Sequence, residues 1–381
     1  MRIQKIDLLD FTVIVIIILF GLIVSALGYI RARQFIKTTV SKQRLVYLAP
    51  AFGVSDLYLL DPNSSAPPER LTKEDFGVYD FSVNKTGNLL AYSADRDNTQ
   101  RNRDIWVLNL ETRQRQLVVE CTQILCATPS WAADGSLLAY EKRQSVDSAN
   151  TEIWLADLIR KTNVPLILNT PENAPAQGVF PKWSPSANQL AYFDSAHEQI
   201  IIVQLNMLDV TVNTIDVIDS VPNPLFAWSQ DGYQMAYVQH QVDDALNRQM
   251  LMRADFSRGM IEPIGEFMDR QFSQPVWSNT MSTRLAVSMR DKLSNGSSSV
   301  LNGQQIWVIE PIKNTNLPIT QRMNSDYYSY GGLKWSGNDN WIVAVRNTAS
   351  FLGEPEIWLV RSDGGDMRLI AQNATLPDWV R

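Results

Sequence analysis

Short apolar segments recur along the chain at intervals of about 50 residues, each beside a turn sequence. The phrase WAADGSLLAY, which begins at Trp131, returns as WSPSANQLAY from Trp183 and as WSQDGYQMAY from Trp228. Short apolar, β-branched and aromatic runs separated by pairs such as Asp134-Gly135 are typical of antiparallel strands joined by hairpins. The pattern therefore predicts one β-structural unit that is used several times.

The unit has three clear landmarks and a weaker fourth. A Trp or apolar position before a turn comes first, then a strand such as LLAYE at 137, then a strand such as IWL at 153. Each landmark occurs seven times, and the final LPDWVR resembles only a first strand. Repeated four-stranded units of this length are typical of propeller blades, with the Trp as a wedge between neighbours. We therefore expect an all-β fold: a seven-bladed β-propeller of four-stranded antiparallel blades over residues 45–381, closed by pairing of its N- and C-terminal strands.

A different pattern precedes the repeats. Residues 11–30 contain no charge, and 20 helical residues span roughly 30 Å, the thickness of a bilayer core. We expect a single transmembrane helix here, between a short tail (1–10) and a basic juxtamembrane linker (31–44). The alternative is a cleaved signal peptide, since Arg2 and Lys5 precede the apolar run, but the run is longer than the usual signal core.

The charge distribution excludes one class of partner. The chain has 34 basic and 40 acidic residues and a net charge of -6, and the linker holds five basic residues and no acidic one. Residues 45–381 are therefore acidic, which argues against a nucleic-acid-binding surface. The basic linker favours a cytoplasmic propeller by the positive-inside rule.

The repeats resemble a known family. WSPSANQLAY from Trp183 and DIWV from Asp104 are similar to the repeats of TolB-like propellers over about residues 45–381. The resemblance implies a propeller that works outside the cytoplasm, against the flanking charges, so both orientations remain open. TolB itself carries an α/β domain before its propeller, where this chain has its apolar run, so a role in the Tol assembly is not carried over.

An enzymatic reading finds little support in the residues. Similar propellers precede the hydrolase domain of prolyl-oligopeptidase-like enzymes, but the chain contains no G-x-S-x-G motif and no residues remain for a catalytic domain. Its only histidines are His197 and His240, which rules out a three-histidine metal site. We expect no cofactor and no catalytic residue, although a metal in the axial channel stays open.

One face of the expected propeller carries the long loops, and loops on a rigid scaffold are where binding concentrates. Tyr327, Tyr328 and Tyr330 fall in the expected loop 323–332, either as interface anchors or as cover for the core between blades. Arg96, Arg101 and Arg103 are placed to hold an acidic partner, or are ordinary loop charges. Cys121 and Cys126 form a disulfide if their segment folds back on itself; otherwise they are two free thiols.

These observations lead to a functional hypothesis. We expect a non-enzymatic, membrane-anchored propeller that binds a protein or peptide partner through its long-loop face, as an accessory subunit of a membrane or envelope complex. The alternative is a hydrolase, a lyase or a carbohydrate-binding module with its site in the axial channel.

Overall fold

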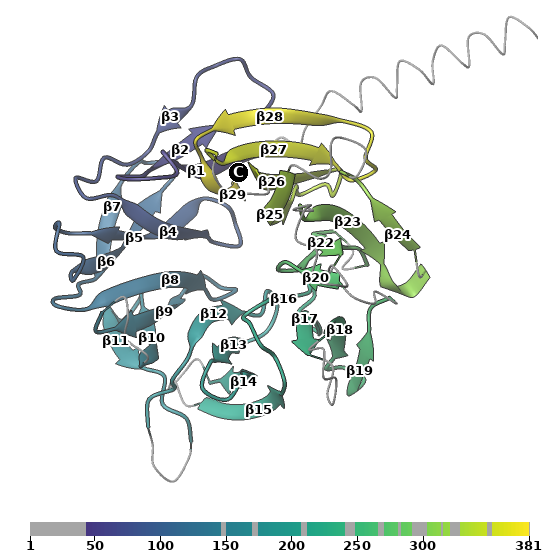
Figure 1. Ribbon diagram of the computed structural model, residues 1–381. Helices are drawn as coiled ribbons and strands as arrows, with labels where there is room; N and C mark the ends of the chain where they lie inside the picture. The colour runs from purple at the N-terminus through teal and green to yellow at the C-terminus, as the bar shows by residue number, and fades with distance from the viewer. Residues whose placement is uncertain are drawn as a thin grey trace, which may run out of the picture. The chain divides into compact units, whose positions relative to one another are not determined.

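Nearly all the regular structure in the described part of the chain is antiparallel β-sheet (Figure 1). The computed structural model describes residues 43–145, 150–169, 174–206, 212–240, 248–265, 270–280, 283–291, 303–313, 315–320, 328–348 and 353–380. Within these ranges the one helical element is a short 3-10 turn, η1 (Pro311–Lys313). The repeated apolar runs form the strands because a half-buried pleated surface suits β-branched and aromatic side chains.

The two ends of the repeat region meet in one sheet. Its strands lie in the order β29 (Thr375–Val380), β1 (Arg44–Ala49), β2 (Asp56–Leu60) and β3 (Glu69–Arg70). Residue Arg44 pairs with Val380 and Leu45 pairs with Trp379. The expected closure by pairing of the N- and C-terminal strands is confirmed.

The next strands form an eight-stranded sheet. Its first half is β4 (Val78–Val83), β5 (Leu89–Asp95), β6 (Arg103–Asn109) and β7 (Arg115–Val119). Its second half is β8 (Leu125–Trp131), β9 (Leu137–Arg143), β10 (Thr151–Asp157) and β11 (Thr162–Pro165). Each half is an antiparallel meander, and a parallel pairing between Arg103 of β6 and Leu125 of β8 joins the two.

Four smaller sheets complete the described strands. The first contains β12 (Val179–Trp183), β13 (Gln189–Asp194), β14 (Gln199–Leu205) and β15 (Val212–Ile218). The second contains β16 (Phe226–Trp228), β17 (Gln234–His240), β18 (Gln249–Asp255) and β19 (Met260–Pro263). The third contains β20 (Arg270–Phe272), β21 (Val276–Trp277), β22 (Leu285–Asp291), β23 (Gln305–Glu310) and β24 (Thr315–Pro318). The fourth contains β25 (Tyr328–Trp335), β26 (Trp341–Thr348), β27 (Glu356–Arg361) and β28 (Met367–Gln372).

The expectation of seven separate four-stranded blades is wrong. Five sheets of four or five strands are separate blades, whereas β4 to β11 share the eight-stranded sheet. The physical reason is local: the backbone N–H of Arg103 donates to the carbonyl of Ile124 at 3.2 Å and holds the start of β8 beside β6. A sequence repeat marks strands, but it does not reveal a hydrogen bond between two neighbouring repeats.

The expected transmembrane helix also needs correction. Residues 11–30, together with the tail and most of the linker, lie outside the described residues. In the part of the chain that the structure describes, no helix is long and apolar enough to cross a membrane. The structure therefore gives no support to the membrane anchor.

The hydrophobic core is divided into layers between consecutive sheets. One layer joins β13, β14 and β16 to β18 through side chains such as Phe193, Phe226 and Tyr237. The inner strands β29, β4, β8, β12, β16, β21 and β25 contact one another in this order around a closed ring. The repeated Trp side chains are buried between them, and the indole N–H of Trp335 in β25 donates to the carbonyl of Val276 in β21 at 3.0 Å. The Trp is thus a wedge between neighbouring inner strands, as the sequence indicated.

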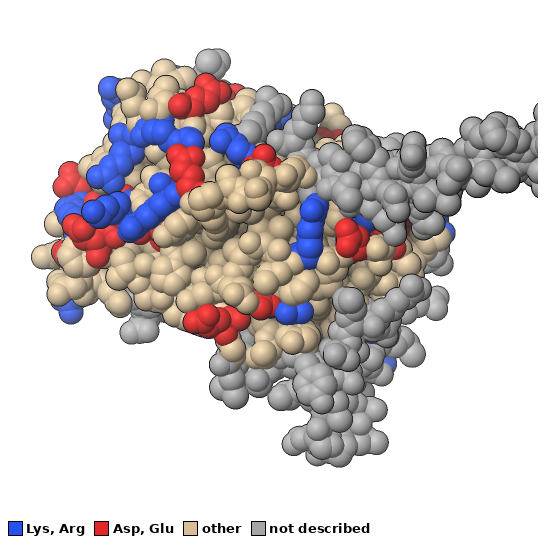
Figure 2. Space-filling view, turned by 90° about the horizontal axis from the view of Figure 1, so that it is seen from above, with Lys and Arg blue, Asp and Glu red and all other residues tan. Residues whose placement is uncertain are grey.

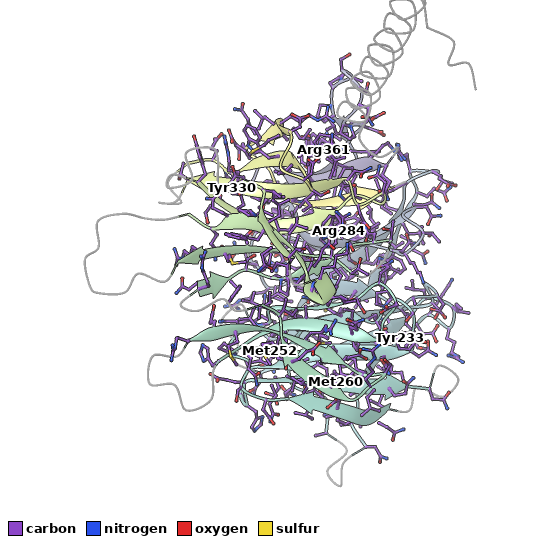
Figure 3. The ribbon with its side chains drawn as sticks, turned by 90° about the vertical axis from the view of Figure 1, so that its right-hand side faces the viewer. Tyr233, Met252, Met260, Arg284, Tyr330 and Arg361 are labelled. Atoms are coloured by element: carbon purple, nitrogen blue, oxygen red, sulfur yellow. A yellow bond between two sulfur atoms is a disulfide. The ribbon has the colours of Figure 1, made fainter. Side chains whose placement is uncertain are left out.

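The ring has two different faces. Tight turns such as 84–88, 132–136 and 229–233 leave from one side, which we call the tight-turn face. The segments 50–55, 71–77 and 96–102 leave from the other side, which we call the long-loop face. Figure 3 shows Tyr233, from a tight turn, and Tyr330, near the start of β25, at opposite edges of the ribbon.

Candidate functional site

Two of the three tyrosines expected in a loop lie in a strand. Tyr327 is outside the described residues, and Tyr328 and Tyr330 belong to β25. The side chain of Tyr330 is only 2% exposed and its hydroxyl lies 3.9 Å from the sulfur of Met367. Tyr328 is half-buried and its ring lies against the guanidinium of Arg346, 4.0 Å away. Tyr330 therefore covers the core between sheets, which was the competing interpretation.

Two of the three expected anchor arginines have partners within the chain. Arg96 forms a bidentate pair with Asp104, with its Nη2 2.6 Å and its Nε 2.8 Å from the two carboxylate oxygens. Arg103 is 4% exposed and its Nε lies 2.7 Å from the Oδ1 of Asp95, directly across the β5–β6 hairpin. Arg101 is exposed. Of the three, only Arg101 presents its side chain freely to a partner.

Cys121 and Cys126 form a disulfide, with their Cα atoms 6.3 Å apart. The backbone N–H of Cys121 donates to Asp104 at 2.7 Å, so the carboxylate that holds Arg96 also holds the disulfide segment. This closed segment leads directly into β8 and places Leu125 beside Arg103. Of the two alternatives left open by the sequence, the structure selects the disulfide.

A pocket of about 270 Å³ lies on the long-loop face beside Arg103, and we call it the outer pocket. Its walls include Phe76, Val78, Tyr79, Asp95, Arg103 and Arg143. The Tyr79 ring centroid is 3.7 Å from the Cζ of Arg103, so an aromatic ring covers the Arg103–Asp95 pair. The Nη1 of Arg103 and the Nε of Arg143 are buried and have no hydrogen-bond partner in the part of the chain that the structure describes.

Exposed apolar side chains surround the outer pocket. Phe76 and Tyr79 are 41% and 48% exposed, and Phe52 and Val54, on either side of the pocket residue Gly53, are 65% and 52% exposed. The two segments touch, since the N–H of Val78 donates to the carbonyl of Ser55 at 2.7 Å. We call Phe52, Val54, Phe76 and Tyr79 the apolar rim. Sequence reasoning missed it, although Phe-Gly-Val stands at both 52–54 and 76–78.

Close approach explains the second Phe-Gly-Val. Gly77 has a φ of +92°, and a Cβ at this position would lie 3.0 Å from the backbone nitrogen of Ser55. Glycine is the residue that tolerates both this backbone region and this contact. Gly77 therefore allows the segment 71–77 to lie against 50–55 and brings the two halves of the rim together.

A second cavity lies at the tight-turn end of the ring, and we call it the axial cavity. It measures about 490 Å³ and is lined by the five tryptophans Trp183, Trp228, Trp277, Trp335 and Trp379. It also contains Lys85, Lys182, Lys334 and Asp378. The Lys334 ammonium pairs with Asp378 at 2.9 Å, and the Lys85 ammonium donates to the carbonyl of Pro185 at 2.8 Å.

Lys182 is the unusual group of the axial cavity. Its Nζ donates to the carbonyl of Phe226 at 2.7 Å and lies 4.4 Å from the centroid of that ring. Burial, with repulsion from Lys334, lowers the pKa of Lys182 to about 7. Because the charged and neutral forms are then close in free energy near neutral pH, this amine is suited to exchange a proton or to hold an anion.

Neither histidine lies in a cavity of this kind. His197 is 70% exposed and its Nδ1 lies 2.8 Å from Asp194 in the same turn, and His240 ends β17. Across the described ranges, no three or more His, Cys, Asp and Glu side chains are grouped so that they could hold a metal ion.

Most surface charge is locally balanced. Figure 2 shows basic and acidic side chains interleaved at one end of the face that it displays. Ion pairs of this type include Arg113 with Glu69 at 2.8 Å and Arg115 with Glu74 at 2.6 Å. Several arginines have no carboxylate partner among the described residues, and Arg143 of the outer pocket is one of them, with Arg101, Arg284 and Arg290.

The fold defines the chain as an all-β propeller protein, and solved structures of several propellers resemble it. No family model matches the sequence, and no curated protein matches it. TolB from Acinetobacter baumannii is 14% identical, with a TM-score of 0.50, over 89% of this chain and 66% of TolB, so the chain spans about two thirds of that protein. An oligogalacturonate lyase in complex with manganese is 13% identical, with a TM-score of 0.56, over 81% of this chain and 83% of the lyase. A prolyl endopeptidase is 12% identical, with a TM-score of 0.59, over 89% of this chain and 49% of the endopeptidase. At these identities the similarity shows the fold alone.

Proposed function

We propose that this chain is a non-enzymatic propeller that binds a protein or peptide partner through its long-loop face, at the apolar rim. The observation that carries the proposal is the gathering of four large exposed apolar side chains on two adjoining segments. Single exposed apolar residues are normal on any protein, whereas a contiguous group of them is typical of an interaction site.

The chemistry of the rim favours a protein or peptide partner. Two of its side chains, Phe52 and Phe76, are phenylalanines, and Tyr79 stacks on the guanidinium of Arg103. Aromatic and arginine side chains supply most of the binding energy at protein interfaces, and charged groups at the centre are few. Arg101, which is exposed on the neighbouring loop, adds a charge at the periphery.

The experiment that tests this proposal compares two faces of the same propeller. We would crosslink the full-length protein in its native source and identify partners by mass spectrometry, for the wild type and the variant Phe52→Ser/Phe76→Ser. The matched control is Ile159→Ser/Tyr233→Ser, which changes two exposed side chains of the tight-turn face, 78% and 60% exposed. Removal of two interface anchors typically costs 2 kcal/mol or more, so we expect roughly a tenfold or greater loss of the crosslinked partner only in the rim variant.

A partner that is captured equally by both variants would contradict the proposal. So would a partner whose crosslinks map to the tight-turn face. In either case the rim would be ordinary surface, and attention would move to the axial cavity.

A second candidate function uses the axial cavity, and Lys182 is the observation that favours it. An amine with a pKa of about 7 is suited to general acid or base chemistry at neutral pH, as in a hydrolase or lyase. The tryptophans and lysines together would also suit a carbohydrate-binding site for an acidic sugar. Loss of binding or turnover of such a ligand on changing Lys182→Met, with the rim intact, would support this alternative.

A further inference from the structure

The outer pocket has an excess of positive charge. Asp95 is paired with Arg103 through contacts of 2.7 and 3.3 Å, which accounts for one of the two arginines in the walls. The second, Arg143, has no ion-pair partner among the residues that the structure describes. A guanidinium remains charged at every physiological pH, so the residues that line the pocket carry one more positive than negative charge.

Two N–H groups of the arginines that line the pocket have no hydrogen-bond partner among the described residues. The Nη1 of Arg103 and the Nε of Arg143 are both buried without a hydrogen-bond partner. Arg103 is only 4% exposed and its guanidinium is held by Asp95, so this side chain cannot turn toward water. Buried donors without a partner are rare, and they cost about 1–3 kcal/mol each. An acceptor that reached either group would remove this cost.

Apart from Gln100 and the charged side chains, the pocket is lined by apolar side chains and glycines. Phe76, Val78 and Tyr79 form one wall, and the Tyr79 ring lies directly over the Arg103 guanidinium. A ligand that reaches the arginines must therefore place an apolar group against these side chains. The volume of about 270 Å³ suits one amino-acid-sized group and little more.

We infer that the outer pocket binds a carboxylate attached to an apolar group, in the form of the C-terminal residue of a peptide or protein partner. The inference rests on the proposed function and names the chemistry that its site recognises. A planar carboxylate matches the forked donors of arginine, as in other Arg–carboxylate pairs. A doubly charged phosphate is a poorer fit, because Asp95 lies in the same wall and would repel it.

The test uses a pair of probes that differ in one group. We would titrate the full-length protein with N-acetyl-phenylalanine and with its amide, and measure binding by calorimetry and by protein-observed NMR. The acid should bind at least tenfold more tightly than the amide, and Arg143→Gln should abolish the difference. Arg258→Gln, an exposed arginine near the turn after β18, is the matched control and should leave it unchanged.

A second pair of probes distinguishes the source of the carboxylate. One short peptide ends in a free phenylalanine carboxylate, and the other has an amidated end and an internal glutamate. We expect only the first to bind, and binding of the second alone would reassign the pocket to acidic side chains and overturn the C-terminal assignment.

Equal binding of acid and amide, or no binding of either, would overturn the inference. Either result leaves the partner-binding proposal standing, because the crosslinking experiment tests the rim without any assumption about a carboxylate. If Arg143→Gln unfolds, Arg143→Lys still tests the inference, because lysine keeps the positive charge but lacks the forked donors of arginine. This variant should bind N-acetyl-phenylalanine about tenfold more weakly than the wild type does.

Discussion

The axial cavity and the outer pocket are built from different kinds of position. The axial cavity is lined by the residue that recurs in nearly every repeat, the Trp that ends the inner strand. The outer pocket is lined by residues outside the landmarks of the repeat, such as Arg103 and Arg143. The repeated positions close the ring, and the others depart from the pattern. The comparison teaches that the repeated positions specify the scaffold, and that a site for specific recognition is better sought among the positions that are not repeated.

The two sites also handle charge differently. In the axial cavity an amine is buried against a carbonyl and an aromatic ring, and its pKa falls to about 7. In the outer pocket Arg103 stays charged and a carboxylate, Asp95, compensates for its burial. Lysine loses its proton readily on burial and arginine does not, so the first site is sensitive to pH and the second is a fixed positive site.

The largest effect on the free energy of unfolding is expected when the side chain at a repeated Trp position is removed. Trp335→Ala deletes a side chain that is 3% exposed and an indole N–H that donates to Val276 at 3.0 Å. Burial of a large aromatic side chain is worth about 3–5 kcal/mol against alanine, so the free energy of unfolding should fall by about 4 kcal/mol. Urea denaturation followed by tryptophan fluorescence and circular dichroism measures it.

Tyr233→Ala is the control for this prediction. Tyr233 is also aromatic, but it lies in a tight turn and is 60% exposed. Its removal should change the free energy of unfolding by less than about 0.5 kcal/mol. Similar losses for the two variants would show that the Trp positions do not act as wedges.

A smaller loss of folding stability is expected when an ion pair of the outer pocket is broken. Arg103→Ala leaves Asp95 with an uncompensated charge, and breaking a buried pair in this way costs about 3 kcal/mol. Asp95→Ala in the same chain should restore much of the stability, because the pair as a whole contributes little. A double-mutant cycle by chemical denaturation measures the coupling, and additive losses would mean that the two side chains are independent.

Much of the scaffold could be predicted from the sequence. The recurrent Leu-Ala-Tyr segments are fully buried strands, and the terminal strand Thr375–Val380 pairs with Arg44–Ala49 as its resemblance to a first strand indicated. These predictions are confirmed because each repeat contains the apolar pattern of a buried strand. The division into sheets was wrong because a contact between repeats, Arg103 with Leu125, merges two of them.

The site was harder to predict, and the tyrosine segment shows why. Tyr-Gly-Gly at 330–332 has the composition of a loop, but the structure places it inside β25. The register of β25 against β26 shifts between Gly331 and Lys334, and Gly332 has a φ of +57°. The glycines therefore serve a β-bulge, which needs the same backbone freedom as a turn.

Arg103 shows the opposite case, in which the sequence held an unused signal. It lies at the start of a strand, and Asp95 lies at the end of the preceding one. In a hairpin of this register the two residues face each other, so their opposite charges at the strand ends are consistent with an ion pair across it. The apolar rim had a comparable signal in its repeated Phe-Gly-Val. What the sequence does not contain is the contact between 50–55 and 71–77, which only the closed fold creates.

The last expected effect concerns the pH dependence of stability in the axial cavity. Because the pKa of Lys182 falls from its usual 10.5 to about 7 on folding, the unfolded chain binds one more proton than the folded chain between these values. The free energy of unfolding should therefore gain a component that rises as the pH increases from about 7 toward 10.5. Lys182→Met removes the titrating group and should remove that component, so its stability relative to the wild type should be highest near pH 6 and should decline above pH 7.

Urea denaturation of both proteins at several pH values between 6 and 10 measures this difference. Ile159→Ser, which is exposed and has no titrating group, is the control and should differ from the wild type by the same amount at every pH. A difference between wild type and Lys182→Met that stays constant with pH would mean that the Lys182 ammonium is solvated or compensated in the folded state. The axial cavity would then hold an ordinary charged lysine, and the second candidate function would lose the observation that favours it.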